Sequence, residues 1–374
     1  MLRDLARKFL DEHLPVQRLR DLVAGDSDAV YERGERAQWD EGLWKQMVEL
    51  GWSGLAVPED AGGVGFKLAG IAALVEEVGR HAVPSPLVAT LNATYVLNAA
   101  GGEVAADWSS RIADGAAASL AITDATGSWD PSSCDVTARV KDERTVLSGS
   151  AHFVQDAFKA DLFLTLARDN DGDGYLLCVV PKDSEGVRLS QNHIHDLTRD
   201  QATVYFEDVS VPQSDIVSTT GAEALERAWP SVLVTVAADL CGCAEWQLQA
   251  TVDYAKDRKQ FDHPLGFFQA VKHPLVNAMM DIDRARSLLY NAACCIDENA
   301  DDAETAARMA KSAASDAGAF ISDRSVQLHG GIGFTWESDV HLFFKRSLHN
   351  QVLYGDGSYQ RLKLADTLIG PIQP

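Results

Sequence analysis

The sequence contains few cysteines, and no long apolar run interrupts its 374 residues. Its six cysteines include no CxxC pair and no cysteine spaced with a histidine as metal ligands are, so we expect neither a zinc site nor a disulfide framework, and no metal. No stretch approaches the ~18 apolar residues of a membrane span, and the first residues lack the apolar region of a secretion signal. These absences predict a soluble, cytoplasmic protein without a membrane partner. We also expect the chain to begin with a helix.

Basic residues are also scarce relative to acidic ones. Lys and Arg number 33 against 55 Asp and Glu, which gives a formal charge of −22 at pH 7. Such a field repels phosphate backbones, so nucleic acid is excluded as a partner, and an anionic small molecule needs a local cluster of cations. What is present, 46% hydrophobic and 24% charged residues, is typical of a globular protein. The length exceeds the ~250–300 residues of a single core, which predicts two or three domains.

The hydrophobic period changes twice along the chain. It is helical over residues 1–115, alternates with a period of two over 116–215, and is helical again in long runs over 216–374. We therefore predict an α+β multi-domain fold, with an N-terminal α-helical domain, a middle antiparallel β-domain and a C-terminal four-helix bundle. This order excludes a Rossmann fold and a TIM barrel, because both alternate strands with helices.

A cationic segment joins two of the long C-terminal helical runs. Arg258 and Lys259 follow one run, and Phe268 and Gln269 open the next. Cations at a helix C-terminus complement the helix dipole, which is one explanation of this pair. The other is that the pair forms the local positive cluster that an anionic ligand needs, because a guanidinium beside an amide and an aromatic ring suits a pyrophosphate. Both explanations remain open.

A second segment places three glycines within four residues after a helical run. One explanation is that Gly330, Gly331 and Gly333 form a C-cap and turn. The other is that they let the backbone approach phosphate oxygens with exposed N–H groups. In the second case Gln327 and His329 add side-chain donors. A lone histidine such as His329 serves equally well as a structural hydrogen-bonding group.

With these segments described, the chain resembles the acyl-CoA dehydrogenase family from end to end. Five stretches carry the resemblance, in this order: LWKQMVELGWSGLAVPEDAGGVGF followed by VEEVGR, AITDATGSWD, VYFEDVSVP, DRKQFDHPLGFFQAV, and VQLHGGIGFTWESDVHLFFKR. The resemblance implies the three-domain fold, an acyl-CoA substrate, an electron acceptor and FAD bound between subunits. It also implies a tetramer built as a dimer of dimers.

The family removes a proton from the carbon α to a thioester with a carboxylate base and passes a hydride to the flavin. The two positions at which the family places that Glu are Tyr354 and Val232 in this chain, and neither side chain is a base at neutral pH. Asp239 is a substitute base or a member of a buried polar pair. Asp356 is a substitute base or the first residue of an Asx turn. The catalytic base is therefore left unassigned.

The resemblance also implies which residues hold FAD. In the family, two segments hold the flavin ring of the same subunit, and both depart from the family pattern here. The loop Thr123–Ser128 is one residue shorter than in the family. Phe153 stands where the family has Trp, and Gln155 stands where it has Thr or Ser. The segments that grip a neighbour's FAD are better kept. They comprise Arg258, Gln260, Phe261, Phe268, Gln269, Gln327, His329, Gly330 and Gly331.

This asymmetry suggests a subunit that completes another chain's active site more than its own. It resembles the heteromeric α2β2 acyl-CoA dehydrogenases of actinobacteria, in which one of two unlike chains supplies the Glu. Those enzymes oxidise bulky CoA thioesters such as steroid side chains. One alternative is a homotetramer with another base or with monooxygenase-type chemistry, which needs no α-proton base. Another alternative is a non-catalytic scaffold that binds a partner or a CoA ligand.

Overall fold

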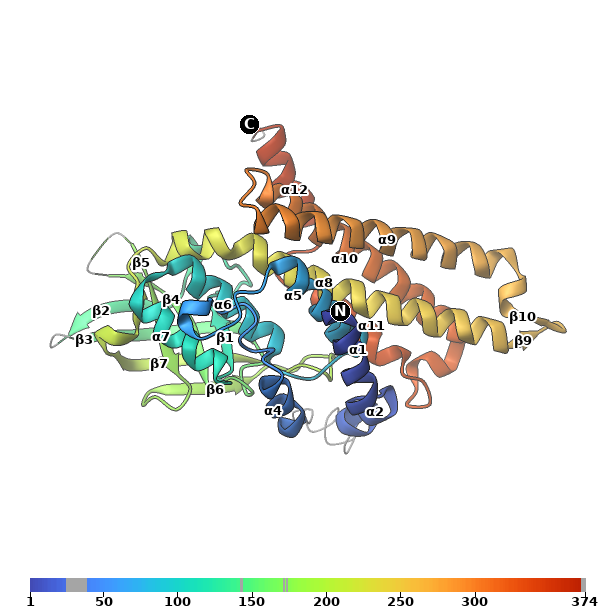
Figure 1. Cartoon of the computed structure of the whole chain (residues 1–374), viewed down its shortest axis with the longest axis horizontal. Helices are drawn as coiled ribbons and strands as arrows, with labels where there is room; N and C mark the ends of the chain where they lie inside the picture. The colour runs from blue at the N-terminus through green and yellow to red at the C-terminus, as the bar shows by residue number, and fades with distance from the viewer. Residues whose placement is uncertain (25–38, 142–143, 171, 173, 371–374) are drawn as a thin grey trace.

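The computed structural model describes residues 1–24, 39–141, 144–170, 172 and 174–370. A sheet lies at one end of the elongated molecule, a helical bundle extends to the other end, and N-terminal helices pack along one side of both (Figure 1). The expected order of helical, β and helical domains is therefore confirmed. None of the helices within the described ranges combines the length and the apolarity that crossing a bilayer requires.

The N-terminal helices are amphipathic or wholly buried. They are α1 (Leu2–His13), α2 (Val16–Ala24), α4 (Glu41–Glu49), α5 (Leu68–Arg80), α6 (Leu87–Ala100) and α7 (Gly102–Ala113). Helix α5 crosses the bundle helix α8 (Gly221–Asp257) at two glycines. A Cβ on Gly79 would lie 2.1 Å from the carbonyl oxygen of Asp239, and one on Gly242 would lie 1.8 Å from that of Glu76. Only glycine permits this approach, which fixes the depth at which Asp239 sits.

The middle domain is one eight-stranded sheet in which β6, β7, β3, β2, β4, β5 and β8 follow in this order and β1 also pairs with β4. Its strands are β1 (Ala118–Ala121), β2 (Thr137–Lys141), β3 (Arg144–Gln155), β4 (Leu162–Asp169), β5 (Tyr175–Pro181), β6 (Val187–Gln191), β7 (Gln201–Val211) and β8 (Ile216–Ser218). Pairing is antiparallel except where β1 and β2 join β4 in parallel. The register of β3 against β7 shifts between Ala151 and Val154, so a bulge lies at the end of β3.

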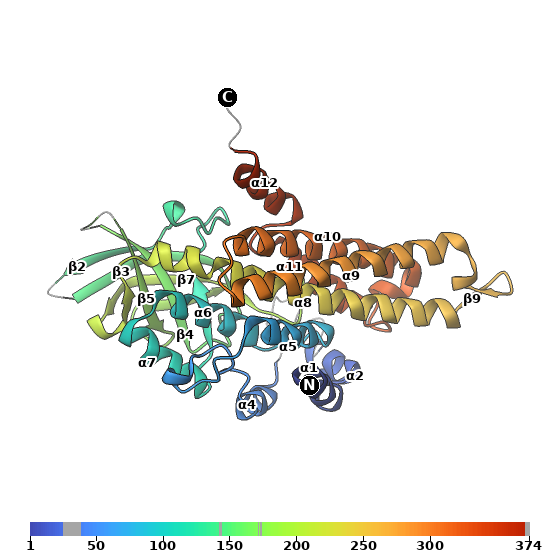
Figure 2. The same cartoon turned by 45° about the horizontal axis from the view of Figure 1, so that its top comes forward.

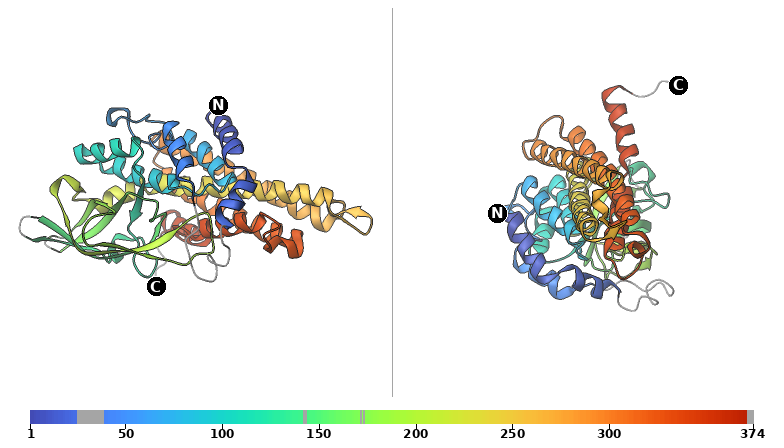
Figure 3. Two further views of the ribbon diagram at one scale, coloured as in Figure 1. Left: turned by 90° about the horizontal axis from the view of Figure 1, so that it is seen from below. Right: turned by 90° about the vertical axis from the view of Figure 1, so that its right-hand side faces the viewer.

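The C-terminal bundle is built from α8, α9 (Gln269–Asp297), α10 (Ala303–His329) and α11 (Val340–Val352). The last helix, α12 (Gly357–Leu368), projects from the bundle, as the views in Figures 2 and 3 show. A small hairpin of β9 (Lys259–Gln260) and β10 (His263–Pro264) joins α8 to α9. Its two central residues, Phe261 and Asp262, have φ of 51° and 61°, as a type I′ turn requires.

Candidate active site

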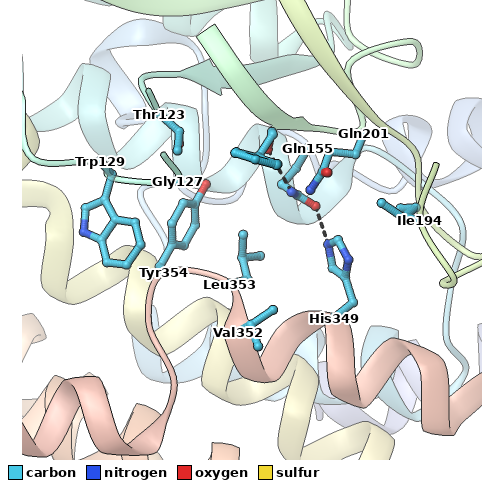
Figure 4. Close-up of a pocket in the computed structure, with 11 residues that line it drawn as sticks. Thr123, Gly127, Trp129, Gln155, Ile194, Gln201, His349, Val352, Leu353 and Tyr354 are labelled. Carbon is cyan, nitrogen blue, oxygen red and sulfur yellow. Dashed lines mark hydrogen bonds between the residues drawn. The ribbon is translucent and has the colours of Figure 1, made fainter. Parts of the chain in front are cut away.

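A cavity of about 340 Å³ lies where the end of α11 meets the sheet (Figure 4). Its walls come from the loop after β1, the end of β3, the start of β7 and the turn between α11 and α12. The lining residues are Thr123, Gly127, Trp129, Phe153, Gln155, Ile194, Gln201, His349, Val352, Leu353 and Tyr354. The volume falls within the ~300–1,000 Å³ typical of ligand pockets.

Tyr354, at the usual base position, lies in the wall of this cavity. It occupies the turn after α11 with φ of 57°, and its ring packs edge-on against Trp229 and Trp129 at centroid distances of 5.0 and 5.9 Å. Burial raises the pKa of Tyr354 further above that of an ordinary phenol. The side chain is therefore neutral at physiological pH and cannot abstract a proton from carbon.

A buried lysine holds the turn that carries Tyr354. The ammonium of Lys311 on α10 donates to the carbonyl oxygens of Gln351 and Gly355, at 2.9 and 2.8 Å, and to the Ser315 hydroxyl at 2.9 Å. Burial lowers the pKa of Lys311 to about 7. Because all three N–H groups are used, Lys311 fixes the turn from both sides of Tyr354.

Asp239 is tied into a buried network of charges away from the cavity wall. Its carboxylate, fully buried, accepts from Arg346 at 2.6 and 2.9 Å, from Arg199 at 2.8 Å and from Asn350 at 2.8 Å. Burial alone would raise the pKa of Asp239, but the charges of Arg346 and Arg199 overcome this effect, and the pKa lies below its ordinary value. The group is a poor proton acceptor that links the sheet to α8 and α11.

The other two candidate positions lie outside the cavity wall. The carboxylate of Asp356 caps the N-terminus of α12 by accepting from the Tyr359 N–H at 2.8 Å. Val232 is a fully buried residue of α8. Neither belongs to the described residues that line the cavity.

Three of the residues expected at a flavin ring, Thr123, Phe153 and Gln155, line the cavity, whereas Ser128 is not among the described residues that line it. Thr123 and Phe153 both line it, and Phe153 keeps 39% of its side chain exposed with φ of 55° at the β3 bulge. The loop between Thr123 and Ser128 is fixed by Asp124, whose carboxylate accepts from the Ser128 N–H at 2.7 Å and from Thr126. The shortened loop is therefore an ordered turn.

The residues expected to grip a neighbour's FAD gather at the far end of the bundle (Figure 1). His329, at the end of α10, stacks on Tyr254 near the end of α8 at 4.3 Å, and its Nδ1 lies 2.8 Å from the Ser325 carbonyl oxygen. Phe261 at the hairpin tip is 84% exposed. The remaining members flank these two contacts and are exposed or half-buried: Arg258, Gln260, Phe268, Gln269, Gln327, Gly330 and Gly331.

The glycine turn at this end leaves its backbone open. Gly330 has φ of 64°, which favours glycine, and a Cβ on Gly330 or Gly331 would meet no atom within 4 Å. The turn continues into the 3-10 helix η5 (Gly330–Phe334). The contacts of His329 with Ser325 and Tyr254 fit the structural explanation, and its position beside the open glycine turn fits the ligand-binding one.

Two cavity residues that make contacts between domains, His349 and Trp129, escape sequence analysis. His349 lies 2.6 Å from Gln155, a residue 194 positions earlier, and Trp129 meets Trp229 through stacked rings at 5.8 Å. Each pair joins segments from different domains. A single sequence carries no signal for such contacts, apart from the unusual position of a histidine near the end of a buried helix.

Comparison with known proteins decides the family. The profile of the acyl-CoA dehydrogenase N-terminal domain matches residues 1–116, that of the middle domain matches 119–209, and that of the C-terminal domain matches 233–369. The acyl-CoA dehydrogenase IpdE2 of Mycobacterium tuberculosis is 32% identical over 93% of this chain and 90% of its own. The chain belongs to the acyl-CoA dehydrogenase family.

Solved structures agree with this membership. A steroid acyl-CoA dehydrogenase described as Tcur3481-Tcur3483 is 29% identical, with a TM-score of 0.85 over 98% of this chain and 96% of its own. The ChsE4-ChsE5 complex of Mycobacterium tuberculosis, 23% identical, shares the fold with a TM-score of 0.87 over 100% of this chain and 97% of its own. Acyl-CoA dehydrogenases are FAD-dependent oxidoreductases acting on acyl-CoA, and this chain is one of them.

The cavity of this acyl-CoA dehydrogenase fits the ring of its cofactor. An aromatic face from Phe153, hydrogen-bonding side chains from Thr123 and Gln155, and an apolar wall from Val352 and Leu353 suit a flat heteroaromatic group with polar edges. When bound, FAD supplies the two-electron acceptor for a hydride. The open backbone at the far end of the bundle suits the phosphates of such a cofactor.

Proposed function

We propose that this chain is one subunit of a heteromeric acyl-CoA dehydrogenase that performs FAD-dependent α,β-dehydrogenation, with the catalytic glutamate supplied by a homologous partner subunit. One observation carries the proposal. The 11 described residues that line the cavity include no aspartate or glutamate. Abstraction of a weakly acidic α-proton needs a carboxylate within hydrogen-bonding reach, so a competent site takes it from another chain.

Within that arrangement, the residues of this chain bind and orient rather than move the α-proton. With a flavin ring in this cavity, Phe153 would stack on the ring, while Thr123 and Gln155 would bond to its polar edge. Trp129 and Leu353 exclude water from the reacting carbons, which strengthens every charge interaction inside the cavity.

The distance between the two sets of FAD-binding residues supports a shared cofactor. Trp229, which packs on Tyr354, and Arg258 lie near opposite ends of α8, roughly 40 Å apart by the rise of a helix. One FAD molecule cannot span both sets. Each flavin therefore lies between two chains, its ring in one cavity and its diphosphate at the bundle end of a neighbour, in an α2β2 tetramer.

The substrate we propose is a CoA thioester with a bulky acyl group of the steroid-derived class. The similarity to a solved steroid acyl-CoA dehydrogenase, 29% identical over 98% of this chain, supports this class. A separate electron acceptor would reoxidise the cofactor, and we place the enzyme in the cytoplasm. A panel of CoA thioesters with short, long and polycyclic acyl groups tests the substrate class directly.

Removing the Tyr354 hydroxyl tests whether this chain has a base of its own. We expect Tyr354→Phe to change kcat of the assembled enzyme by less than about twofold, because a neutral buried phenol takes no part in proton abstraction. Tyr359→Phe is the matched control, since Tyr359 also packs on Trp129, at 5.3 Å, outside the cavity wall. A loss of kcat beyond a hundredfold in Tyr354→Phe alone, with FAD content unchanged, would assign the base to Tyr354 and overturn the proposal.

A further inference from the structure

A chain of hydrogen bonds crosses the cavity from α11 to the bulge of β3 (Figure 4). The Nε2 of His349 lies 2.6 Å from the side-chain oxygen of Gln155, and the Nε2 of Gln155 donates to the carbonyl oxygen of Phe153 at 2.9 Å. All three residues line the cavity. The backbone of Gln155 is itself anchored, because its carbonyl accepts from the Ser119 hydroxyl at 2.6 Å.

The chemistry of an amide oxygen fixes the direction of this chain. An amide oxygen only accepts, so His349 must carry its proton on Nε2. Burial lowers the pKa of His349 to about 4, which makes the ring neutral and leaves Nδ1 unprotonated. The other end of the side chain fixes the Gln155 amide in the same sense. The carbonyl oxygen of Phe153 only accepts, so it must face the amide nitrogen, which leaves the amide oxygen toward His349.

Without the His349 N–H, only the bond to the Phe153 carbonyl would favour this orientation, and the Gln155 amide would turn over more readily. In one orientation Gln155 presents N–H groups to the cavity, and in the other it presents an oxygen. A flavin ring carries both acceptor atoms and an N–H donor, so the two orientations do not bind it equally. The contact has a second consequence, because it restrains the carbonyl of Phe153, whose own φ of 55° is a conformation that costs free energy outside glycine.

We propose that His349 is a positioning residue for the cofactor: its Nε2–H fixes the Gln155 amide so that the second N–H of Gln155 is the donor to the flavin ring and Phe153 is held against that ring. This inference rests on the placement of the flavin ring in the cavity under the proposed function. It does not depend on which chain supplies the base.

FAD titration of the assembled apoenzyme, followed by flavin fluorescence and by the visible absorption band, tests the proposal. We expect His349→Leu to raise the dissociation constant for FAD roughly 5- to 20-fold, the effect of losing one oriented hydrogen bond, and to shift the visible band. His349→Gln, which places an amide N–H near the position of Nε2, is expected to restore most of the affinity. His341→Leu is the matched control, because His341 is a buried histidine of the same helix that packs edge-on against Trp336 at 4.9 Å.

The variant Phe153→Ala distinguishes a failure of the proposed role of His349 from a failure of the proposed flavin site. Weakened FAD binding in Phe153→Ala together with unchanged affinity and spectrum in His349→Leu would overturn the role of His349 alone. Unchanged FAD binding in both variants would place the flavin ring elsewhere and would overturn the proposed site as well. Equal losses in His349→Leu and His349→Gln would also contradict the proposal, since the conservative variant keeps the donor.

Discussion

Asp239→Asn will lower the free energy of unfolding by about 3–5 kcal/mol, the usual cost of breaking a buried ion pair from one side. The substitution leaves the guanidinium groups of Arg346 and Arg199, which are 0% and 3% exposed, facing a neutral amide. Because Arg199 lies in the loop just before β7 and Arg346 lies on α11, the loss loosens the contact between the middle domain and the bundle. The midpoint of urea unfolding measures the effect.

Asp253→Asn is the matched control for this substitution. Asp253 lies on the same helix and pairs with Lys256 at 3.2 Å, but its side chain is 55% exposed, so we expect a change below about 1 kcal/mol. The opposite pattern would contradict our interpretation. If Asp239→Asn kept wild-type stability and bound FAD normally but lost turnover a hundredfold or more, Asp239 would be the catalytic base.

The second large effect is expected from Lys311→Met. Methionine keeps the apolar stem but removes three N–H donors, so the carbonyls of Gln351 and Gly355 keep only longer contacts, both of 3.4 Å, from Ser315 and Gln360. We expect the free energy of unfolding to fall by about 2–4 kcal/mol, and the turn around Tyr354 to become more sensitive to protease. Urea unfolding and limited proteolysis of the folded protein measure these two results.

Lys363→Met provides the comparison for this variant. Lys363 is exposed on α12, where its ammonium lies 5.6 Å from the centre of the Tyr359 ring, and its loss should change stability by less than about 0.5 kcal/mol. Equal stability of the two variants, with the turn equally resistant to protease, would show that Lys311 does not hold the turn.

Local patterns explain why much of the fold could be predicted. The short apolar runs DLFLTLAR and GYLLCVVP give β4 and β5, which are buried along most of their length, and the helical period of Ile71–Val78 gives α5. The hairpin between α8 and α9 could not be predicted in this way. It depends on positive φ at Phe261 and Asp262, and neither residue is the glycine or asparagine that usually announces such a turn.

The candidate site could also be predicted only in part. Counting from the glycine motif places Tyr354 at the base position, and the structure puts it in the cavity wall beside Thr123 and Phe153. The fate of Asp239 depends instead on Arg346, which is 107 residues away in the chain. An isolated acid in an apolar run predicts only that some partner exists. The identity of that partner comes from packing between domains, which no local pattern encodes.

The amount of flavin bound per chain tests the central claim most directly. We would record the visible spectrum and acyl-CoA turnover of this chain purified alone and of the same chain co-purified with a homologous subunit that carries the glutamate. We predict a colourless, inactive chain that becomes yellow and active only with its partner, at about half a flavin per chain in a symmetric α2β2 assembly. A chain that alone binds about one flavin and oxidises an acyl-CoA would contradict it.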